Sequence, residues 1–446
     1  MKIGDSLELK IDDIGSGGEG IAHREEYTVF VPFALPAETI KAKITYVKRN
    51  LAYGVMTHIL EESPERVTPV CPIYYRCGGC DLMHLNYEAQ LQSKRQNLIH
   101  ILRKNCGYTG EVMPMVASPD LFHYRNKIQL PFGRKDGKTV LGFYKPGSHI
   151  LVPLTKCLLH GEWATKLIRI VTDFADKYKI SVYDEASQKG LLRHLVARFL
   201  DGTIMVTLVM NGRQLPQAEK LVSALRAEFN NSSLYLSINT KRTNVILGNQ
   251  LVPVYAPKQT VRVQGIEVEI NPMSFFQVND AVRDLIYSAT IAAIAPDTKS
   301  IVIDAYSGVG LLGAILAKKG AQIYNIEIVP EAVRDANKLY RTNGLSAVNL
   351  CADAAKALPE LIPQFADSVD YLSVILDPPR KGCDPAVLRA LTSHPVSKLI
   401  YISCNPATLS RDLALLQPAY DIQSITPYDM FPNTRHVETV VLMSRV

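Results

Sequence analysis

The chain has 446 residues, too many for one hydrophobic core, so its length predicts two or three domains. Hydrophobic residues make up 47%, but no run of them is long enough for a signal peptide or a membrane span. We therefore exclude a secreted or membrane protein and expect a cytoplasmic one without a membrane partner. The net charge of +6 is uneven, because residues 1–265 hold 34 Lys and Arg against 24 Asp and Glu, whereas residues 266–446 hold 15 against 19.

This asymmetry favours a protein that holds a polyanion with its front part and acts on it with its back part. Scattered solvated charges would give the same totals, so the motifs must decide.

Residues 1–62 contain short runs rich in β-branched and aromatic residues, such as YTVFVPF and IKAKITYV. The glycine cluster GSGGEG at 15–20 separates two of these runs and is typical of a turn. The pattern predicts a small β-barrel as the first domain.

Residues 63–265 mix strand-like and helical patterns. Leu91, Leu98, Ile101 and Leu102 fall near helical spacing within residues 87–103. From residue 124 onward, strand-like runs return, including LVARFL, TIMVTLVM and SLYLSIN. We predict a middle α+β domain over this range.

Residues 266–446 alternate apolar strand runs with helical runs, beginning with SIVIDAYSG, GLLGAILAKKG and IYNIEIV. That alternation predicts an α/β domain with a doubly wound, Rossmann-like parallel sheet.

The segment IVIDAYSGVGLLG predicts a nucleoside site at the end of the first strand of that sheet. Gly308 and Gly310 let the backbone approach a ligand, and Glu327 follows 19 residues after Gly308, where an acid binds both ribose hydroxyls. No third glycine or P-loop lysine follows, which disfavours a dinucleotide or a nucleoside triphosphate. Asp353, after a third strand, is a candidate for binding adenine or simply for capping a helix.

Two later strands end in residues that carry chemistry. VILDPPRKG places Asp377 at a strand end, and LIYISCNPATLSRD places Cys404 in a turn facing the same crevice. A lone cysteine is more often inert and buried, but a cysteine in such a turn is available as a nucleophile. Glu438, in the strand-like RHVETVVLM, is the candidate base, although taken alone it would be read as a surface carboxylate.

Several motifs together resemble the RNA uracil-5 methyltransferases, closest to the bacterial 23S ribosomal RNA branch with an N-terminal TRAM domain. They are GEGIA, the CxxxxxCGGC run, FHYRNK, SFFQVN, DAYSGVG, DPPRKG, SCNPATLSRD and HVET. The resemblance covers essentially the whole chain. It implies S-adenosylmethionine as cofactor, Cys404 as nucleophile and Glu438 as proton acceptor. It also implies cofactor contacts by Gln277, Tyr306, Glu327 and Asp377. Leu311, directly after Gly310, departs from relatives that have Asn near this position, which puts that one contact in doubt.

The implied chemistry needs a nucleophile. Carbon 5 of uracil is unreactive toward a sulfonium methyl until a thiolate adds to carbon 6, so covalent catalysis by Cys404 would be required. A base such as Glu438 must then remove the proton from carbon 5 before the thiol is eliminated.

Cys71, Cys77 and Cys80 form a C-x5-C-x2-C pattern typical of a metal centre. A fourth thiolate must come from Cys106 or Cys157. The resemblance implies Cys157 and a [4Fe-4S] cluster, whereas spacing alone suits tetrahedral zinc equally well.

We expect 23S ribosomal RNA as the partner, with the target uridine in a single-stranded loop or flipped out of its stack. Candidate phosphate contacts are Lys41, Lys43, Lys48, Arg49, Arg125, Lys127, Arg134 and Lys135, and candidate stacking residues are Phe275 and Phe276. A monomer is expected. The alternatives are a transfer RNA uridine methyltransferase and a catalytically silent RNA-binding protein of the same fold.

Overall fold

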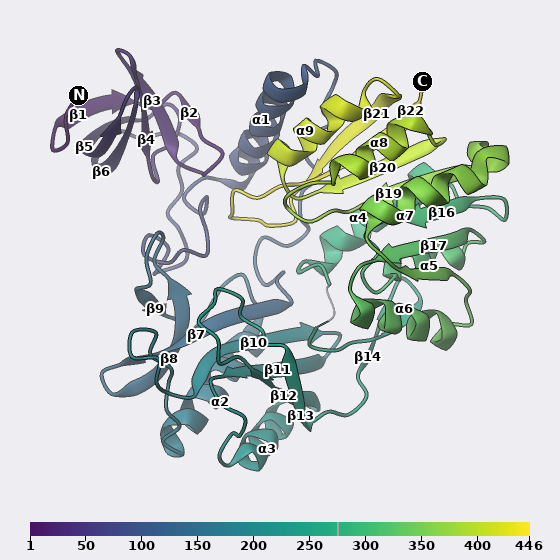
Figure 1. The fold of residues 1–446 in the computed structure, drawn as a ribbon. Coiled ribbons are helices and arrows are strands. Elements are labelled where there is room, and N and C mark those ends of the chain that lie inside the picture. Colours follow the sequence, from purple (N-terminus) through teal and green to yellow (C-terminus); the bar gives the residue numbers. More distant parts are fainter. Residues whose placement is uncertain (274–275) are drawn as a thin grey trace.

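The computed structural model describes residues 1–273 and 276–446, and Figure 1 shows three folded parts along the chain. The first part is a curled sheet with strand order β1-β5-β6-β4-β3-β2. Its strands are β1 (Ser6–Lys10), β2 (Asp13–Ile14), β3 (Gly20–Arg24), β4 (Tyr27–Val31), β5 (Thr39–Lys48) and β6 (Leu51–Glu61). In β5, Ile40, Ala42 and Ile44 are buried while Lys41 and Lys43 are exposed, so the period-2 pattern sets which face forms the core.

The middle part is a seven-stranded sheet with order β13-β12-β11-β10-β7-β8-β9, packed against α2 and α3. Its elements are β7 (Lys127–Lys135), β8 (Lys138–Tyr144), β9 (Leu151–Pro153), α2 (Glu162–Lys177), β10 (Leu192–Leu200), β11 (Thr203–Met210), α3 (Ala218–Glu228), β12 (Asn231–Ile238) and β13 (Gln250–Tyr255). Every residue of β11 is buried, as expected for a central strand covered on both faces. The hairpin of β14 (Thr260–Val263) and β15 (Ile266–Glu269) leads to the third part.

The third part has the predicted doubly wound sheet, with order β18-β17-β16-β19-β20-β22-β21. Its strands are β16 (Ile301–Asp304), β17 (Gln322–Glu327), β18 (Val348–Cys351), β19 (Leu372–Leu376), β20 (Lys398–Ser403), β21 (Tyr420–Tyr428) and β22 (Glu438–Arg445). The helices are α4 (Asp280–Ile294), α5 (Leu311–Ala317), α6 (Pro330–Thr342), α7 (Ala354–Leu361), η1 (Ile362–Tyr371), α8 (Pro385–Ser393) and α9 (Pro406–Leu416). β16 to β20 run parallel, and β22 returns antiparallel to β20.

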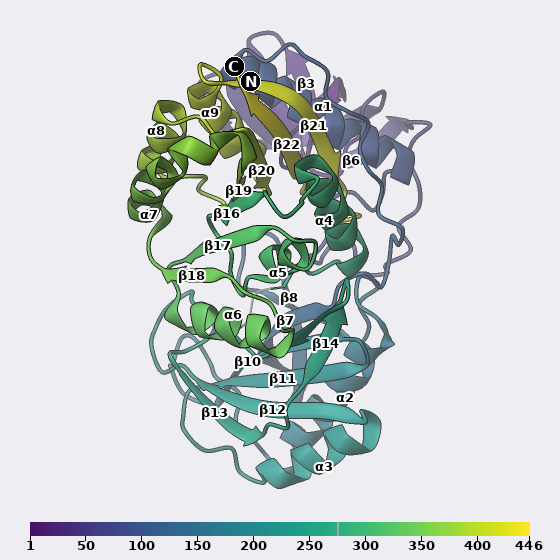
Figure 2. The ribbon, with the colours of Figure 1, turned by 90° about the vertical axis from the view of Figure 1, so that its right-hand side faces the viewer.

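Helices cover both faces of this sheet, as Figure 2 shows, with α4 and α5 on one side and α7, α8 and α9 on the other. The two cores are separate, because side chains alternate between the faces of each strand.

Helix α1 (Tyr87–Cys106) precedes the middle part in the sequence but packs against α9 of the third part (Figure 1). Its Leu98 and Leu102 are fully buried there. The segment that follows α1 also joins the third part, because Val116 forms a strand bridge with Tyr428. Residues 87–116, predicted within the middle domain, therefore pack with the third sheet.

No helix in the described ranges is long and apolar enough to cross a membrane.

Candidate active site

Four parallel strands of the third sheet end at one edge, and each end carries a polar residue or a cysteine, three of them predicted site residues. β16 ends in Asp304 and β17 in Glu327, while Asp377 follows β19 and Cys404 follows β20. Because the carboxyl ends of parallel strands open onto the same crevice, these four side chains share one edge.

Two backbone amides, one in the turn after β16 and one in the turn after β17, donate hydrogen bonds to the carboxylate of Glu327. Gly308 N donates to Glu327 Oε2 at 3.0 Å, and Val329 N donates to Oε1 at 2.8 Å. Gly310 has φ +73°, and a Cβ there would lie 3.2 Å from the ring of Tyr340, so glycine is required on both counts. Glu327 is thereby fixed at the position from which an acid binds ribose hydroxyls in such sheets.

A narrow cavity beside this turn is lined by Gln277, Tyr306 and Asp377, three of the predicted cofactor residues. Leu311 lines the same cavity and is buried, so at this position the wall is apolar rather than polar. The structure thus brings most of the predicted cofactor residues to one place, with Glu327 at its glycine turn.

Asp353 is not among the residues that line this cavity. It accepts a hydrogen bond from Ala355 N at 3.0 Å and caps the N-terminus of α7. The pKa of Tyr306 is raised by burial, next by Cys383, and then by the negative charge of Asp353. The Asp353 carboxylate is therefore near the Tyr306 ring. The helix-cap role is formed, and the adenine contact stays a prediction.

Cys404 and Glu438 lie at the ends of two neighbouring antiparallel strands. The last pair of β20 and β22 is Ser403 with Thr439, so Cys404 follows this pair on one strand and Glu438 precedes it on the other. The Glu438 carboxylate raises the pKa of the Cys404 thiol, after burial, so the two side chains are near each other. The structure therefore brings together the two residues expected to act as nucleophile and base.

The surroundings of this pair set its proton chemistry. Glu438 is buried, and burial raises its pKa well above the usual value, with the Asp377 carboxylate adding to the rise. Burial also raises the pKa of the Cys404 thiol, and so does Glu438. Arg380 opposes both shifts through its positive charge.

Sequence analysis did not single out Arg380. Its guanidinium hydrogen-bonds to the Cys404 thiol and lowers the pKa of that group. Its carbonyl oxygen accepts from Asn405 Nδ2 at 2.9 Å and Thr408 Oγ1 at 3.2 Å, which ties the Asp377 turn to the Cys404 turn. The sequence signal that could have pointed to Arg380 is a cation three residues after Asp377, the aspartate that follows β19.

Asp304, which is buried, and Asp377, which is partly exposed, both line this cavity and form an acidic pair. Burial raises the pKa of Asp377 to about 7, and burial together with Asp377 raises the pKa of Asp304 to about 7. Both carboxyls therefore change charge near neutral pH, where a bound cation would favour their ionised forms.

Cys404 opens into a second cavity of about 310 Å³ on the other side of the strand ends. Gly15, Ser16 and Gly18 of the first domain line one wall of it, and α1 lines another. Arg380 and Arg435 line it beside Cys404. A polyanion reaching Cys404 would thus pass between the first domain and the third.

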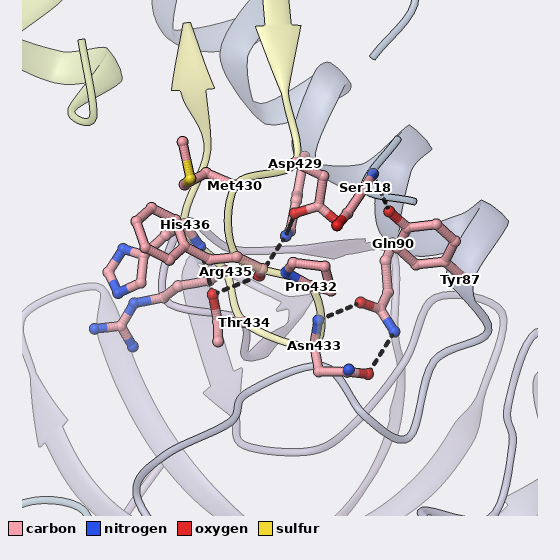
Figure 3. Close-up of polar contacts among 12 residues, drawn as sticks. Tyr87, Gln90, Ser118, Asp429, Met430, Pro432, Asn433, Thr434, Arg435 and His436 are labelled. Carbon is pink, nitrogen blue, oxygen red and sulfur yellow. Dashed lines mark hydrogen bonds and ion pairs between the residues drawn. The ribbon is translucent and has the colours of Figure 1, made fainter. Parts of the chain in front are cut away.

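Residues 429–437 form the loop between β21 and β22, and its last three residues line this second cavity. Figure 3 shows how α1 holds this loop. Lys94 Nζ donates to Asp429 Oδ1 at 2.6 Å and to Phe431 O at 3.1 Å. One turn earlier on α1, Gln90 Oε1 accepts from Asn433 N at 3.0 Å. Because Glu438 follows directly, these contacts fix the start of β22.

The cysteine-bearing segment and the first domain also contact this loop. Asp81 N donates to Asn433 O at 3.0 Å, and Arg435 Nη1 lies 3.5 Å from Asp81 Oδ1. Arg435 Nη1 also donates to Gly17 O at 3.1 Å. The first domain, the cysteine-bearing segment and the third part therefore meet beside the second cavity.

Cys71, Cys77, Cys80 and Cys157 line one cavity of about 450 Å³. Cys106 lies elsewhere, at the end of α1, where its thiol donates to Leu102 O. Within residues 1–273 and 276–446, no group of three or more His, Cys, Asp or Glu side chains is arranged to hold a metal ion. The four predicted ligands therefore line one cavity, but their sulfur atoms are not arranged around a single metal position.

Some residues expected to contact RNA lie elsewhere. Arg125 and Lys127 line the cysteine cavity, where burial lowers the pKa of Lys127 to about 8. Phe276 is 4% exposed and packs in a core, so its expected stacking role was wrong. Phe275 lies outside the described residues. The four predicted cations of the first domain are exposed, namely Lys41, Lys43, Lys48 and Arg49.

A doubly wound sheet with a glycine turn and an acid at the end of its second strand defines an α/β protein that binds a nucleoside-containing ligand, and Cys404 beside the buried Glu438 adds a candidate nucleophile and base. Comparison with known proteins gives the particular family. The chain belongs to the tRNA (uracil-5-)-methyltransferase family, whose model matches residues 86–446, and a TRAM domain model matches residues 1–57.

Relatives agree over the full length. An RNA methyltransferase of Caldanaerobacter subterraneus is 38% identical over 100% of this chain and 99% of its own, and one from Clostridium tetani is 36% identical over 100% and 97%. The crystal structure of Pyrococcus abyssi tRNA (uracil-54, C5)-methyltransferase with S-adenosyl-L-homocysteine superposes with a TM-score of 0.79. It shares 27% identity and covers 98% of this chain and 99% of its own. The protein is therefore an S-adenosylmethionine-dependent RNA methyltransferase.

Proposed function

We propose that the protein methylates carbon 5 of a uridine in 23S ribosomal RNA through a covalent bond between Cys404 and carbon 6. The observation that supports this proposal is that Cys404 and Glu438 both flank the last pair of β20 and β22, where Glu438 affects the pKa of the Cys404 thiol. A nucleophile and a base on one face are what carbon-5 methylation requires.

The first step is the addition of the Cys404 thiolate to the uracil ring. The new Sγ–C6 bond moves the electron pair of the C5=C6 double bond onto the ring as an enolate, so carbon 5 becomes nucleophilic. Burial and Glu438 raise the pKa of Cys404, and Arg380 favours the thiolate before addition because its charge opposes that rise. When bound, S-adenosylmethionine supplies the electrophilic methyl group and leaves as S-adenosylhomocysteine.

The second step is proton removal by Glu438. Its carboxylate accepts the proton from carbon 5, the C–H electron pair restores the double bond, and the Sγ–C6 bond breaks to release the Cys404 thiolate. Because burial raises the pKa of Glu438, its carboxylate is a stronger base than one in water.

We propose that Gln277, Tyr306, Glu327 and Asp377 bind the cofactor, as the family resemblance implies. Three of them line one cavity, and Glu327 is anchored at its glycine turn. Asp353 remains a candidate for the adenine.

Transfer RNA is the second candidate substrate, because the Pyrococcus abyssi relative acts on uracil 54 of tRNA. That relative covers 98% of this chain, so the first domain does not separate the two substrates. Incubation of the protein with tritiated cofactor and either a 23S RNA transcript or a tRNA pool tests the proposal. Label in 5-methyluridine from the 23S transcript alone supports the proposal. Label from tRNA alone contradicts 23S RNA as the substrate, but it agrees with methylation at carbon 5.

We further propose that Cys71, Cys77, Cys80 and Cys157 hold a [4Fe-4S] cluster. Four thiols around a cavity of about 450 Å³ leave room for a bulky group, whereas a single tetrahedral zinc needs sulfurs about 2.3 Å from one centre. The flanking cations Arg125 and Lys127 suit a group of negative charge.

Iron, sulfide and zinc analysis of the purified protein tests this assignment. We expect about four iron and four sulfide per chain, with the iron lost in Cys80→Ser and retained in Cys106→Ser. Stoichiometric zinc without sulfide would refute the cluster.

A further inference from the structure

A row of aromatic side chains crosses the outer face of the first domain. Phe30 of β4 pairs with Tyr53 of β6, and Tyr53 pairs with Tyr46 of β5. The ring centroids of Phe30 and Tyr53 lie 5.3 Å apart in a stacked arrangement with 27° between the planes, and those of Tyr46 and Tyr53 lie 6.0 Å apart, edge to face at 61°. Three adjacent strands therefore present one continuous aromatic surface.

This row does not fill the core of its domain. Tyr46 is 47% exposed and Tyr53 is 44% exposed, and the neighbouring Leu51 and Val55 are exposed as well. The core on the opposite face is built from other residues, among them Val29, Ala42, Ile44 and Ala52. A contiguous apolar surface left in water on a small domain marks an interaction site.

Positive charge surrounds the row. Residues 1–62 hold 7 Lys and Arg against 10 Asp and Glu, but residues 39–60 hold four Lys and Arg and no acid. Lys43 pairs with Val55 on one side of the row, and Lys48 pairs with Leu51 on the other. The cations are thus concentrated where the aromatic rings are exposed.

We infer that this row is a stacking platform for unpaired bases of the RNA strand that flanks the target uridine, an inference that rests on the proposed function. Exposed aromatic rings with cations beside them bind single-stranded nucleic acid, because every base can stack on a ring and phosphates need positive charge. An apolar protein partner would use the rings but not the flanking lysines.

The sheet connects the platform to the catalytic cavity. The β2–β3 turn, with Gly15 and Gly18, lines the cavity of Cys404, and β4 lies next to β3. At a strand spacing of about 4.8 Å, β4 is about 10 Å from β2 and β5 is about 19 Å from it. A strand that leaves the cavity on this side would meet Phe30 first and Tyr46 last.

Tyr53→Ala and Tyr46→Ala in the full chain test the platform, with fluorescein-labelled single-stranded oligouridine as the probe. We expect each variant to raise the Kd for this probe about tenfold, the loss of one stacked base. Tyr53→Phe should bind like the parent, because it keeps the ring. Tyr371→Ala is the matched control, since Tyr371 is 47% exposed beside Lys299 on the third part.

An unchanged Kd in both alanine variants would overturn the inference, provided that their unfolding temperatures match the parent. So would an equal loss of affinity for a blunt RNA hairpin without unpaired ends, or a loss of self-association in place of RNA binding. Methylation by the parent separates the two proposals: if the parent methylates RNA while both variants bind oligouridine normally, only the platform fails. If the parent methylates no RNA, the proposed function fails.

Discussion

If Asp377 binds the cofactor as proposed, the two aspartates that line the cavity, Asp304 and Asp377, should make cofactor binding sensitive to pH. The pKa of Asp377 and that of Asp304 are both raised to about 7, chiefly by burial, so both carboxyls are largely neutral at pH 6 and ionised at pH 8. A sulfonium gains a favourable partner only when Asp377 is ionised. The affinity for S-adenosylmethionine should therefore fall as the pH falls below 7.

We expect its Kd to rise about tenfold from pH 8 to pH 6, as proton linkage at one site dictates. The Kd of S-adenosylhomocysteine, whose sulfur is neutral, should change far less. Isothermal titration of both ligands measures the difference, with Asp370→Asn as an exposed-carboxylate control. Parallel pH profiles for the two ligands would contradict the role of Asp377.

At the residue scale, the sequence predicts side chains that stand at strand ends better than side chains whose direction depends on packing. Cys404 follows an apolar strand directly, so its place at the crevice can be read from the pattern. A role beside Cys404 could not be assigned to Arg380 from the sequence, because a long side chain in a turn can point toward the crevice or away from it. Phe276 was misread, since sequence does not tell a stacking ring from a buried one.

At the scale of elements, α1 acts as a brace for the loop that precedes Glu438. Lys94 and Asp429 form a buried ion pair across 335 positions of sequence. Burial lowers the pKa of Lys94, and the charge of Asp429 opposes that shift. Each member therefore compensates the cost of burying the other, and removing one leaves an unpaired buried charge.

Removal of the lysine in Lys94→Met should lower the free energy of unfolding by about 3–5 kcal/mol, because a buried carboxylate loses its partner. The double variant Lys94→Met with Asp429→Leu should regain much of this stability, while kcat stays reduced because the loop loses its anchor. Urea unfolding and initial rates measure both. In the exposed pair of Arg445 and Asp370, Arg445→Met should cost less than about 1 kcal/mol. Equal effects of Lys94→Met and Arg445→Met would argue against the brace.

The sequence predicts the helix itself but not where it docks. The apolar spacing of Leu98 and Leu102 indicates one buried face, and nothing local says that α9 covers it. Contacts between segments hundreds of residues apart depend on the complete fold, which is why residues 87–116 were expected in the middle domain.

At the scale of the whole molecule, the first domain and α1 meet the third part at the cavity of Cys404, and charge is spread unequally along the chain. Residues 1–265 have ten more cations than anions, from 34 Lys and Arg against 24 Asp and Glu. Counterion release should therefore weaken RNA binding as salt rises.

We expect the Kd for a 23S RNA fragment to rise more than tenfold between 50 and 200 mM salt, as about three or more phosphate contacts predict. The Kd for S-adenosylhomocysteine, bound in a small interior cavity, should change little over the same range. An RNA affinity that is insensitive to salt would contradict the electrostatic account.

The most direct test of the central claim uses RNA in which 5-fluorouridine replaces uridine. Fluorine at carbon 5 cannot be removed as a proton by Glu438, so the enzyme should stall after methyl transfer with the RNA bound to Cys404. Mass spectrometry of the digested complex should find the methylated fluoropyrimidine on the peptide containing Cys404, and Cys404→Ser should give no adduct. Methylation of ordinary RNA by Cys404→Ser at the parent rate, or an adduct on another residue, would contradict the account.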